Sequence, residues 1–208
     1  MAVQTRQSTP WQRAEPRTVD RAAGLILLIL AAQFMTIIML AASIAPRYDY
    51  HAAAISDLGV IPETSLLFNL SLVAVGVLNI VGGYLFYRSH GRRWILAVFV
   101  IAGIGAAGAG LLPLDRSEFH GLFALAAFLF FNLEAIATGQ VTHGPIRWVS
   151  RVAGATGLAF VVLMVIGDSG SAAVFEPIGH GGAERMIVFP VMLWMLVVGG
   201  WLLGRDPA

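Results

Sequence analysis

Histidines, carboxylates and one arginine gather in three short polar stretches, which long apolar runs separate from one another. Imidazole and carboxylate groups that meet at a membrane boundary can act as general acids and bases. They are also suitable ligands for Zn²⁺ or another divalent cation. The candidate residues of a catalytic or ligand-binding site, in chain order, are His51, Ser56, Asp57, Asp115, His120, His180, Glu184 and Arg185.

The histidines His51, His120 and His180 are the candidate metal ligands, and a plainer interpretation stands beside that one. His51 and His180 also fit the pattern of solvated loop residues. His120 falls in the first turn of an expected helix, where a polar side chain at membrane depth should face the interior of a bundle. We therefore expect His120 to be the histidine most directly involved in function.

Two of the carboxylates also have structural interpretations. Ser56 and Asp57 precede a Leu-Gly pair, which is typical of a turn whose aspartate accepts backbone N–H groups. Asp115 and Glu118 have the spacing of a capping box at the start of a helix. Either interpretation is compatible with a role in a site.

Glu184 and Arg185 are predicted to open the last apolar segment. A buried arginine needs partners, and Asp57 or Asp115 from another loop would supply a carboxylate. Such a pair would either clamp a lipid phosphate or lock the loops together, and locking is the commoner role of a buried ion pair.

Glu134 lies at membrane depth, 14 residues after His120 and so about 21 Å further along a helix. An ionisable group inside a membrane segment is a functional hypothesis by default. Glu134 can instead be held by a membrane-depth amide or by an arginine near the same boundary. The functional alternative is a relay for protons or cations.

Composition requires lipid as the solvent, because the 208 residues are 58% hydrophobic and only 12% charged. A soluble domain carries about 25% charged residues, and a membrane-spanning helix needs about 20 apolar residues. We predict an all-α integral membrane protein, a bundle of six transmembrane helices. Their expected ranges are 22–45, 65–87, 94–112, 121–141, 148–167 and 186–203. Residues 1–20 are expected to form a flexible cytoplasmic tail, and 21–205 one transmembrane domain.

Arginine placement predicts the orientation of this bundle. Of the 13 basic residues, all are arginine and ten fall on the side that holds both termini. Only Arg47, Arg116 and Arg185 fall on the opposite side. We therefore expect both termini to be cytoplasmic and the candidate site to face outward. The many glycines and alanines of 94–112 and 148–167 predict close helix packing.

Three segments carry a resemblance to a known family. ISDLG at 55–59, LLPLDRSEFHGLFALAAF at 111–128 and GGAERMIVFPVMLW at 181–194 resemble the prokaryotic six-helix membrane proteins catalogued as domain of unknown function 998. The resemblance covers nearly the whole chain after residue 20 and implies a prokaryotic plasma membrane, but it implies no activity.

Two further likenesses are weaker. The chain is similar to the six-helix family around the GPI-anchor lipid-remodelling factor, which has a serine-rich motif before its second helix and a histidine opening its fourth. It also shares residue types with the membrane hydrolases that include alkaline ceramidases, which use serine, aspartate and three histidines around zinc. The chain has neither the HxxxH pair nor the seven spans of those hydrolases.

We predict an outward-facing site at the outer-leaflet boundary that binds or processes a lipid headgroup, with zinc or another divalent metal as a compatible cofactor. One alternative is a small-solute or proton-coupled transporter that uses Glu134. Another is a scaffold or accessory subunit without chemistry. The expected partners are the bilayer, a lipid substrate, and a membrane protein or second copy. The absence of cysteine excludes disulfides and thiolate metal sites, and no basic patch favours nucleic acid.

Overall fold

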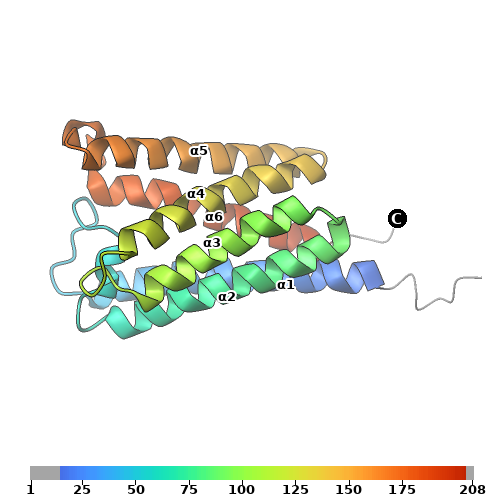
Figure 1. Cartoon of the computed structure of the whole chain (residues 1–208), viewed down its shortest axis with the longest axis horizontal. Coiled ribbons are helices and arrows are strands. Elements are labelled where there is room, and N and C mark those ends of the chain that lie inside the picture. Colours follow the sequence, from blue (N-terminus) through green and yellow to red (C-terminus); the bar gives the residue numbers. More distant parts are fainter. Residues whose placement is uncertain (1–14, 205–208) are drawn as a thin grey trace, which may run out of the picture.

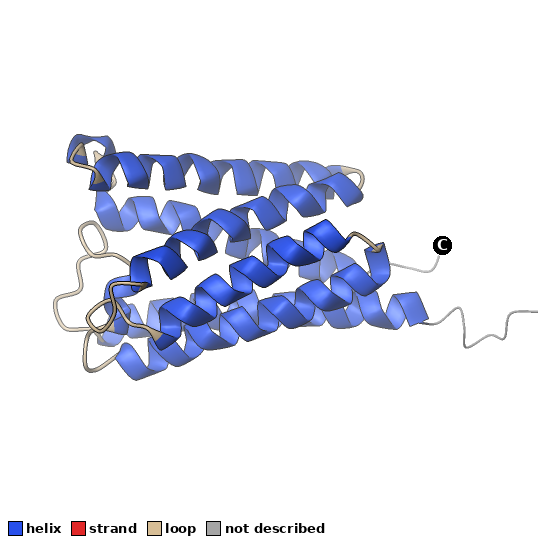
Figure 2. Ribbon diagram, in the orientation of Figure 1, coloured by secondary structure: helices blue, strands red, loops and turns tan. Residues whose placement is uncertain are grey.

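The computed structural model describes residues 15–204, and it is built almost entirely of helices (Figures 1 and 2). Two short 3-10 helices, η2 (Ser56–Gly59) and η3 (Ala172–Phe175), lie in the connections, and the described residues contain no strand. The six long helices are α1 (Glu15–Ile44), α2 (Ser65–His90), α3 (Arg93–Leu111), α4 (His120–Val141), α5 (Pro145–Asp168) and α6 (Gly179–Leu203). All six are long and apolar enough to cross a membrane.

The predicted six-helix bundle is confirmed, and three helices begin at least three residues earlier than expected. α1 begins at Glu15, so residues 15–20 of the expected tail are helical, while 1–14 lie outside the described residues. α5 begins at Pro145, where proline suits the first turn of a helix after Gly144 at φ 68°. α6 begins at Gly179, so Glu184 lies in its second turn and does not open the helix.

The helices form a closed ring in chain order. Each helix packs against its neighbours in sequence, and α6 returns to pack against α1. The connections 45–64, 112–119 and 169–178 lie together at one end of the bundle, at the left of Figure 1, which we call the polar end. The connections 91–92 and 142–144 lie at the opposite end, together with the start of α1 and the end of α6.

Glycines let the helices of the ring approach closely, as predicted. A methyl group on Gly76 of α2 would collide with the carbonyl oxygen of Gly103 on α3, and the reverse is also true. The same reciprocal relation joins Gly24 of α1 to Gly199 of α6. Small residues at such contacts allow the backbone–backbone packing on which membrane helices depend.

The outer surface of the ring is apolar and needs lipid around it. In each span, half or fewer of the residues in the most apolar window are buried. Large apolar side chains such as Leu66, Met39 and Val152 are more than 60% exposed. A soluble protein rarely exposes so continuous an apolar surface, so the six helices place this chain in a bilayer.

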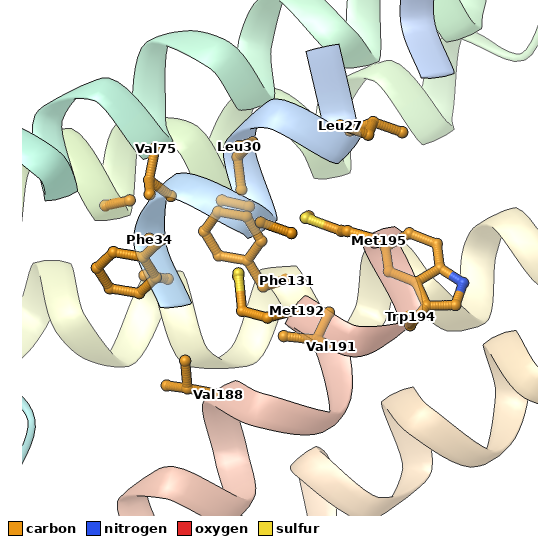
Figure 3. Close-up of a cluster of buried hydrophobic side chains, with 14 of the residues drawn as sticks. Leu27, Leu30, Phe34, Val75, Phe131, Val188, Val191, Met192, Trp194 and Met195 are labelled. Carbon is orange, nitrogen blue, oxygen red and sulfur yellow. The ribbon is translucent and has the colours of Figure 1, made fainter. Parts of the chain in front are cut away.

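The centre of the ring is filled by large side chains, which Figure 3 shows in part. Phe34, Phe131 and Met192 converge there from α1, α4 and α6. Towards the polar end the residues facing the centre become small, and they include Ala106, Ala109, Ala124 and Ala127. A cavity remains at that level because alanine side chains do not fill the width of the ring.

Candidate functional site

Arg185 ties the start of α6 to the first connection of the polar end. Its guanidinium Nη1 donates to the carbonyl oxygens of Tyr50 (3.0 Å), Ala53 (3.2 Å) and Gly181 (2.6 Å). Its Nη2 donates to the Tyr48 hydroxyl at 2.7 Å. The predicted pairing with Asp57 or Asp115 is therefore wrong: the Nη atoms of Arg185 are held by carbonyl oxygens and a phenol, and its Nε is buried without a hydrogen-bond partner.

Two tyrosine rings complete the surroundings of Arg185. The guanidinium carbon lies 4.8 Å from the Tyr50 ring centroid and 5.6 Å from that of Tyr48, within the range of cation–π attraction. Burial raises the pKa of the Tyr48 hydroxyl to about 12, although Arg185 beside it acts to lower it. Tyr48 therefore stays neutral and donates to the Ala54 carbonyl at 2.7 Å.

Further contacts between the first and third connections involve His51. Its backbone carbonyl accepts the Gly181 N–H at 2.9 Å, and its Nε2 donates to the Pro177 carbonyl at 3.2 Å. Gly179, at φ 72°, lies so close to the His51 carbonyl that a Cβ there would collide with it. His51 is exposed, and its contacts join the first connection to Pro177 and Gly181. It does not line either of the two cavities described below.

Asp57 has the role that the turn pattern predicts. Its Oδ2 accepts the backbone N–H of Ala54 at 2.9 Å, and the segment forms the 3-10 helix η2. Glu184 binds the same loop from α6, where its Oε2 accepts the Ile55 N–H at 2.5 Å. Asp57 thus fixes the loop from within, and Glu184 fixes it from α6. Ser56 lies between Ile55, which is bound to Glu184, and Asp57.

His120 is buried at the first residue of α4, with 5% of its surface exposed. Its Nδ1 donates to the Leu112 carbonyl at 2.9 Å, because a carbonyl oxygen can only accept. The proton on Nδ1 leaves Nε2 as a hydrogen-bond acceptor in the neutral ring. The prediction that His120 faces the bundle interior is confirmed.

His180 lies in the first turn of α6 and pairs with the end of α5. Its Nε2 lies 3.2 Å from Asp168 Oδ1, and its ring packs edge-on against Phe175 at 5.0 Å. Asp168 belongs to the site through this pair, although no spacing in the sequence singles it out from the other acidic residues at the same end.

The second connection stands apart from the other two. Asp115 lies 4.0 Å from Arg116 in an exposed ion pair, and both residues line a separate cavity of about 630 Å³ beside Pro62 and Asn69. The predicted capping box is wrong, because α4 begins only at His120 and its N-cap, Phe119, makes no side-chain hydrogen bond. Asp115 does not reach the other candidate residues.

Two adjoining cavities open at the polar end. The central cavity lies inside the ring, has a volume of about 60 Å³ and is lined by α1, α2, α3, α4 and α6. The lateral cavity, of about 370 Å³, lies among α4, α5 and α6, where the ribbons of α4 and α5 diverge towards the polar end in Figure 1. Leu125 and Val165 in its lining are also exposed on the outside of the bundle.

The two cavities meet at a polar junction. Ser56, His120 and Glu184 line both of them, and the His180–Asp168 pair lines the lateral cavity alone. Four predicted site residues are therefore brought together: Ser56, His120, His180 and Glu184. We refer to Ser56, His120 and Glu184 as the junction triad.

The three histidines do not meet as a metal site. His51 donates to Pro177, His120 donates to Leu112 and His180 faces Asp168. Within residues 15–204, no three histidine or carboxylate side chains are grouped closely enough to hold a metal ion. The residues present do not fit the expected zinc site, because the three imidazoles lie against three different partners, Pro177, Leu112 and Asp168, and do not converge on one point.

Glu134 occupies a separate buried polar cluster nearer the opposite end. Its Oε2 accepts Asn79 Nδ2 at 2.9 Å, and the same amide nitrogen donates to the Phe99 carbonyl at 3.0 Å. This is one of the two structural partners expected for Glu134. Glu134 lines neither cavity.

The chain belongs to the family described as "Protein of unknown function (DUF998)", which matches residues 25–201. This match covers all six helices, so it defines the class: a six-span membrane protein whose family has no described activity. No curated protein and no solved structure matches the chain.

Proposed function

We propose that the protein binds an amphipathic membrane lipid at its polar end, with the headgroup at the junction triad. The observation that carries this proposal is that three polar side chains converge where an apolar cavity inside the bundle meets one open to its side. The three polar side chains would contact the headgroup of a lipid, and the apolar walls beside them would contact its tail.

The junction favours a headgroup that donates hydrogen bonds. The Glu184 carboxylate is an acceptor, His120 has its Nε2 lone pair free, and the Ser56 hydroxyl can accept as well as donate. Arg185 lines neither cavity, and its Nη atoms are engaged by three carbonyls and Tyr48, so it offers a phosphate in the cavities no direct contact. An ammonium or hydroxyl headgroup is therefore the expected ligand.

Arginine placement supports an outward-facing polar end. The opposite end carries most of the arginines, which membrane proteins retain on the cytoplasmic side. With this orientation the lateral cavity opens towards the outer leaflet of the cell membrane. A lipid would then enter between α4 and α5 without leaving the bilayer.

The proposal is tested by lipid retention in native mass spectrometry of the purified protein. Phosphatidylethanolamine and phosphatidylcholine are both zwitterionic, but only the first has N–H donors. We expect about tenfold greater retention of phosphatidylethanolamine, the effect of one good charged hydrogen bond. Equal retention of both lipids, or retention of neither, would contradict the proposal.

The same preparation tests whether the lipid is processed. Mass analysis of the lipids after incubation would reveal any product cleaved from the headgroup. Unchanged lipid together with selective retention supports binding alone, whereas absence of retention favours the scaffold alternative.

A further inference from the structure

We propose that the protein has a second lipid site, a groove between α2 and α3 that binds an anionic phospholipid through its phosphate. Arg116 is the phosphate ligand, and apolar side chains on the outer faces of the two helices contact the lipid tail. Among the residues that the structure describes, this groove shares none of its lining with the two cavities at the junction triad. The inference therefore goes beyond the proposed function and does not depend on it.

The groove is the separate cavity beside Asn69, with a volume of about 630 Å³. α2 lines it from Ser65 to Val73, and α3 lines it with Gly110 and Leu111. The two helices lie side by side, and the first and second connections line the polar end of the groove (Figure 1). Small-molecule sites have volumes of about 300–1,000 Å³, so the groove is large enough for a phosphate and the glycerol beside it.

Three contacts fix the shape of the groove. Asn69 Nδ2 donates to the Gly59 carbonyl at 2.8 Å, which ties the first connection to α2. A Cβ on Gly110 would lie 2.8 Å from the Asn69 carbonyl oxygen, so this glycine lets the end of α3 lie directly against α2. In the second connection, the Arg116 N–H donates to the Pro113 carbonyl at 3.0 Å. A site that is already formed loses less conformational freedom when a ligand binds.

Arg116 is the one basic side chain among the described residues that line the groove, and it is accessible to a ligand. Its side chain is 78% exposed, and its Nε lies 4.0 Å from Asp115 Oδ2, which is long for an ion pair. Exposed pairs of this kind contribute little, so a phosphate can replace Asp115 as the partner. The planar donors of a guanidinium match two phosphate oxygens at once, and the Ser65 hydroxyl adds a further donor to the lining.

The apolar walls identify the ligand as a lipid and not as a free phosphate ion. Leu66 and Leu70 on α2 are 73% and 61% exposed, and Leu111 on α3 is 68% exposed. All three line the groove, so its apolar surface continues onto the outside of the bundle, where the bilayer is the solvent. The tail lies along these side chains among neighbouring lipids, and the groove encloses only the phosphate and the glycerol.

A headgroup with a net negative charge gains most from Arg116. A phosphate monoester carries a charge of about −1.5 to −2 at pH 7. In a zwitterionic headgroup the ammonium offsets the charge of the phosphate and weakens the attraction to Arg116. Phosphatidic acid, a two-tailed phosphate monoester, and phosphatidylcholine with the same tails are therefore the two probes. Neither gives the acceptors of the junction triad an N–H donor, so both probes report on the groove.

The test is photo-crosslinking of the full-length protein in vesicles. Each probe carries a photoactivatable group on an acyl chain close to the glycerol, and mass spectrometry of the peptides locates the labelled residues. Labelling of 59–73 and 110–116 reports the groove. Labelling of 88–94, at the arginine-rich opposite end of the bundle, is the internal reference, because anionic lipids are attracted there in every variant.

Three variants make the test specific to Arg116. Relative to the internal reference, Arg116→Gln should lower labelling of the groove by phosphatidic acid about tenfold. Arg47→Gln removes an exposed arginine from the same end but outside the groove, and it should change labelling by less than about twofold. Asp115→Ala removes the competing carboxylate and should raise labelling about twofold.

Several results would overturn the second site. Equal losses in Arg116→Gln and Arg47→Gln would reduce the effect to diffuse attraction between charges. A loss in Asp115→Ala, or equal labelling of the groove by phosphatidic acid and phosphatidylcholine, would contradict the role of Arg116. Displacement of phosphatidic acid by an excess of inorganic phosphate would assign the groove to the free ion. None of these results depends on retention of phosphatidylethanolamine at the junction triad, so the two proposals fail separately.

Discussion

Glu184 and Glu134 are both buried carboxylates on spanning helices, and their surroundings differ. Glu184 is 4% exposed and Glu134 is fully buried. Each accepts one hydrogen bond, Glu184 from the Ile55 backbone and Glu134 from the Asn79 side chain. Only Glu184 lines a cavity, and it lines two. Burial of a charged group inside a membrane segment therefore does not define a site by itself; access to open space does.

The difference arises from the residues that face each carboxylate. Around Glu184 the neighbouring elements present alanines and a loop backbone, which leave space. Glu134 lies beside Asn79, which also donates to the Phe99 carbonyl, in the part of the bundle filled by the hydrophobic core. Glu134 therefore has a structural role, as the acceptor of a hydrogen bond that joins α4 to Asn79 of α2.

The largest expected effect concerns Arg185, whose hydrogen bonds fix the first connection next to Glu184. Arg185→Met removes the donors to three carbonyls and to Tyr48, and leaves the Gly181 carbonyl buried and the other acceptors partly buried. Breaking a buried charged network costs about 3 kcal/mol, or roughly 6–12 °C in melting temperature for a protein of this size. Thermal unfolding in detergent measures this loss. Arg185→Lys, which lacks the planar set of guanidinium donors, should retain only part of the wild-type stability. An unchanged melting temperature for Arg185→Met would contradict the role of Arg185 in fixing the loop.

A smaller and more selective effect is expected at Glu184 itself. In Glu184→Gln the amide oxygen can still accept the Ile55 N–H, so the loop should remain in place. The loss of the negative charge should lower retention of phosphatidylethanolamine about tenfold, with melting temperature nearly unchanged. Retention measured by native mass spectrometry checks this result. An unaltered lipid preference would remove Glu184 from the headgroup site.

The matched change at the other carboxylate should affect neither property strongly. Glu134→Gln retains an acceptor for Asn79 Nδ2 and removes the ionisable carboxyl group. We expect a change in the free energy of unfolding within about 1 kcal/mol and lipid retention within about twofold of the wild-type value. A large loss of lipid retention here would break the distinction between the two carboxylates and restore a functional role for Glu134.

The smallest effect is expected in the second connection. Asp115→Ala removes one partner of an exposed ion pair whose side chains are 52% and 78% exposed. Surface pairs of this kind contribute about 0–1 kcal/mol. Melting temperature and phosphatidylethanolamine retention should both stay close to the wild-type values. A marked loss of retention would place this connection in the site after all.

The architecture could be predicted from the sequence because lipid imposes simple requirements on it. Apolar length gave six spans, and the glycines and alanines of α3 and α5 predicted close contacts. The sequence predicts the start of α6 seven residues too late, because the charges of Glu184 and Arg185 are typical of a helix end. Inside the bundle these charges are satisfied by the Ile55 N–H and by loop carbonyls, so the helix continues through them.

The site could be predicted only in part. Grouping all polar residues at one end correctly brought together Ser56, His120, His180 and Glu184. It could not separate them from His51 or Asp115, because the separation depends on which side chains face the cavities. Tyr48 was missed as the partner of Arg185, since nothing in a local pattern pairs a tyrosine with an arginine 137 positions away.

The reciprocal glycine contact between α1 and α6 bears on how the protein is made. Gly24 on the first helix finds its partner, Gly199, only on the sixth. Throughout the insertion of the four intervening segments, the first helix must keep that face unpartnered in the bilayer. The ring of helices therefore closes only after the sixth helix has been inserted, and the central cavity that the ring encloses forms at the same step.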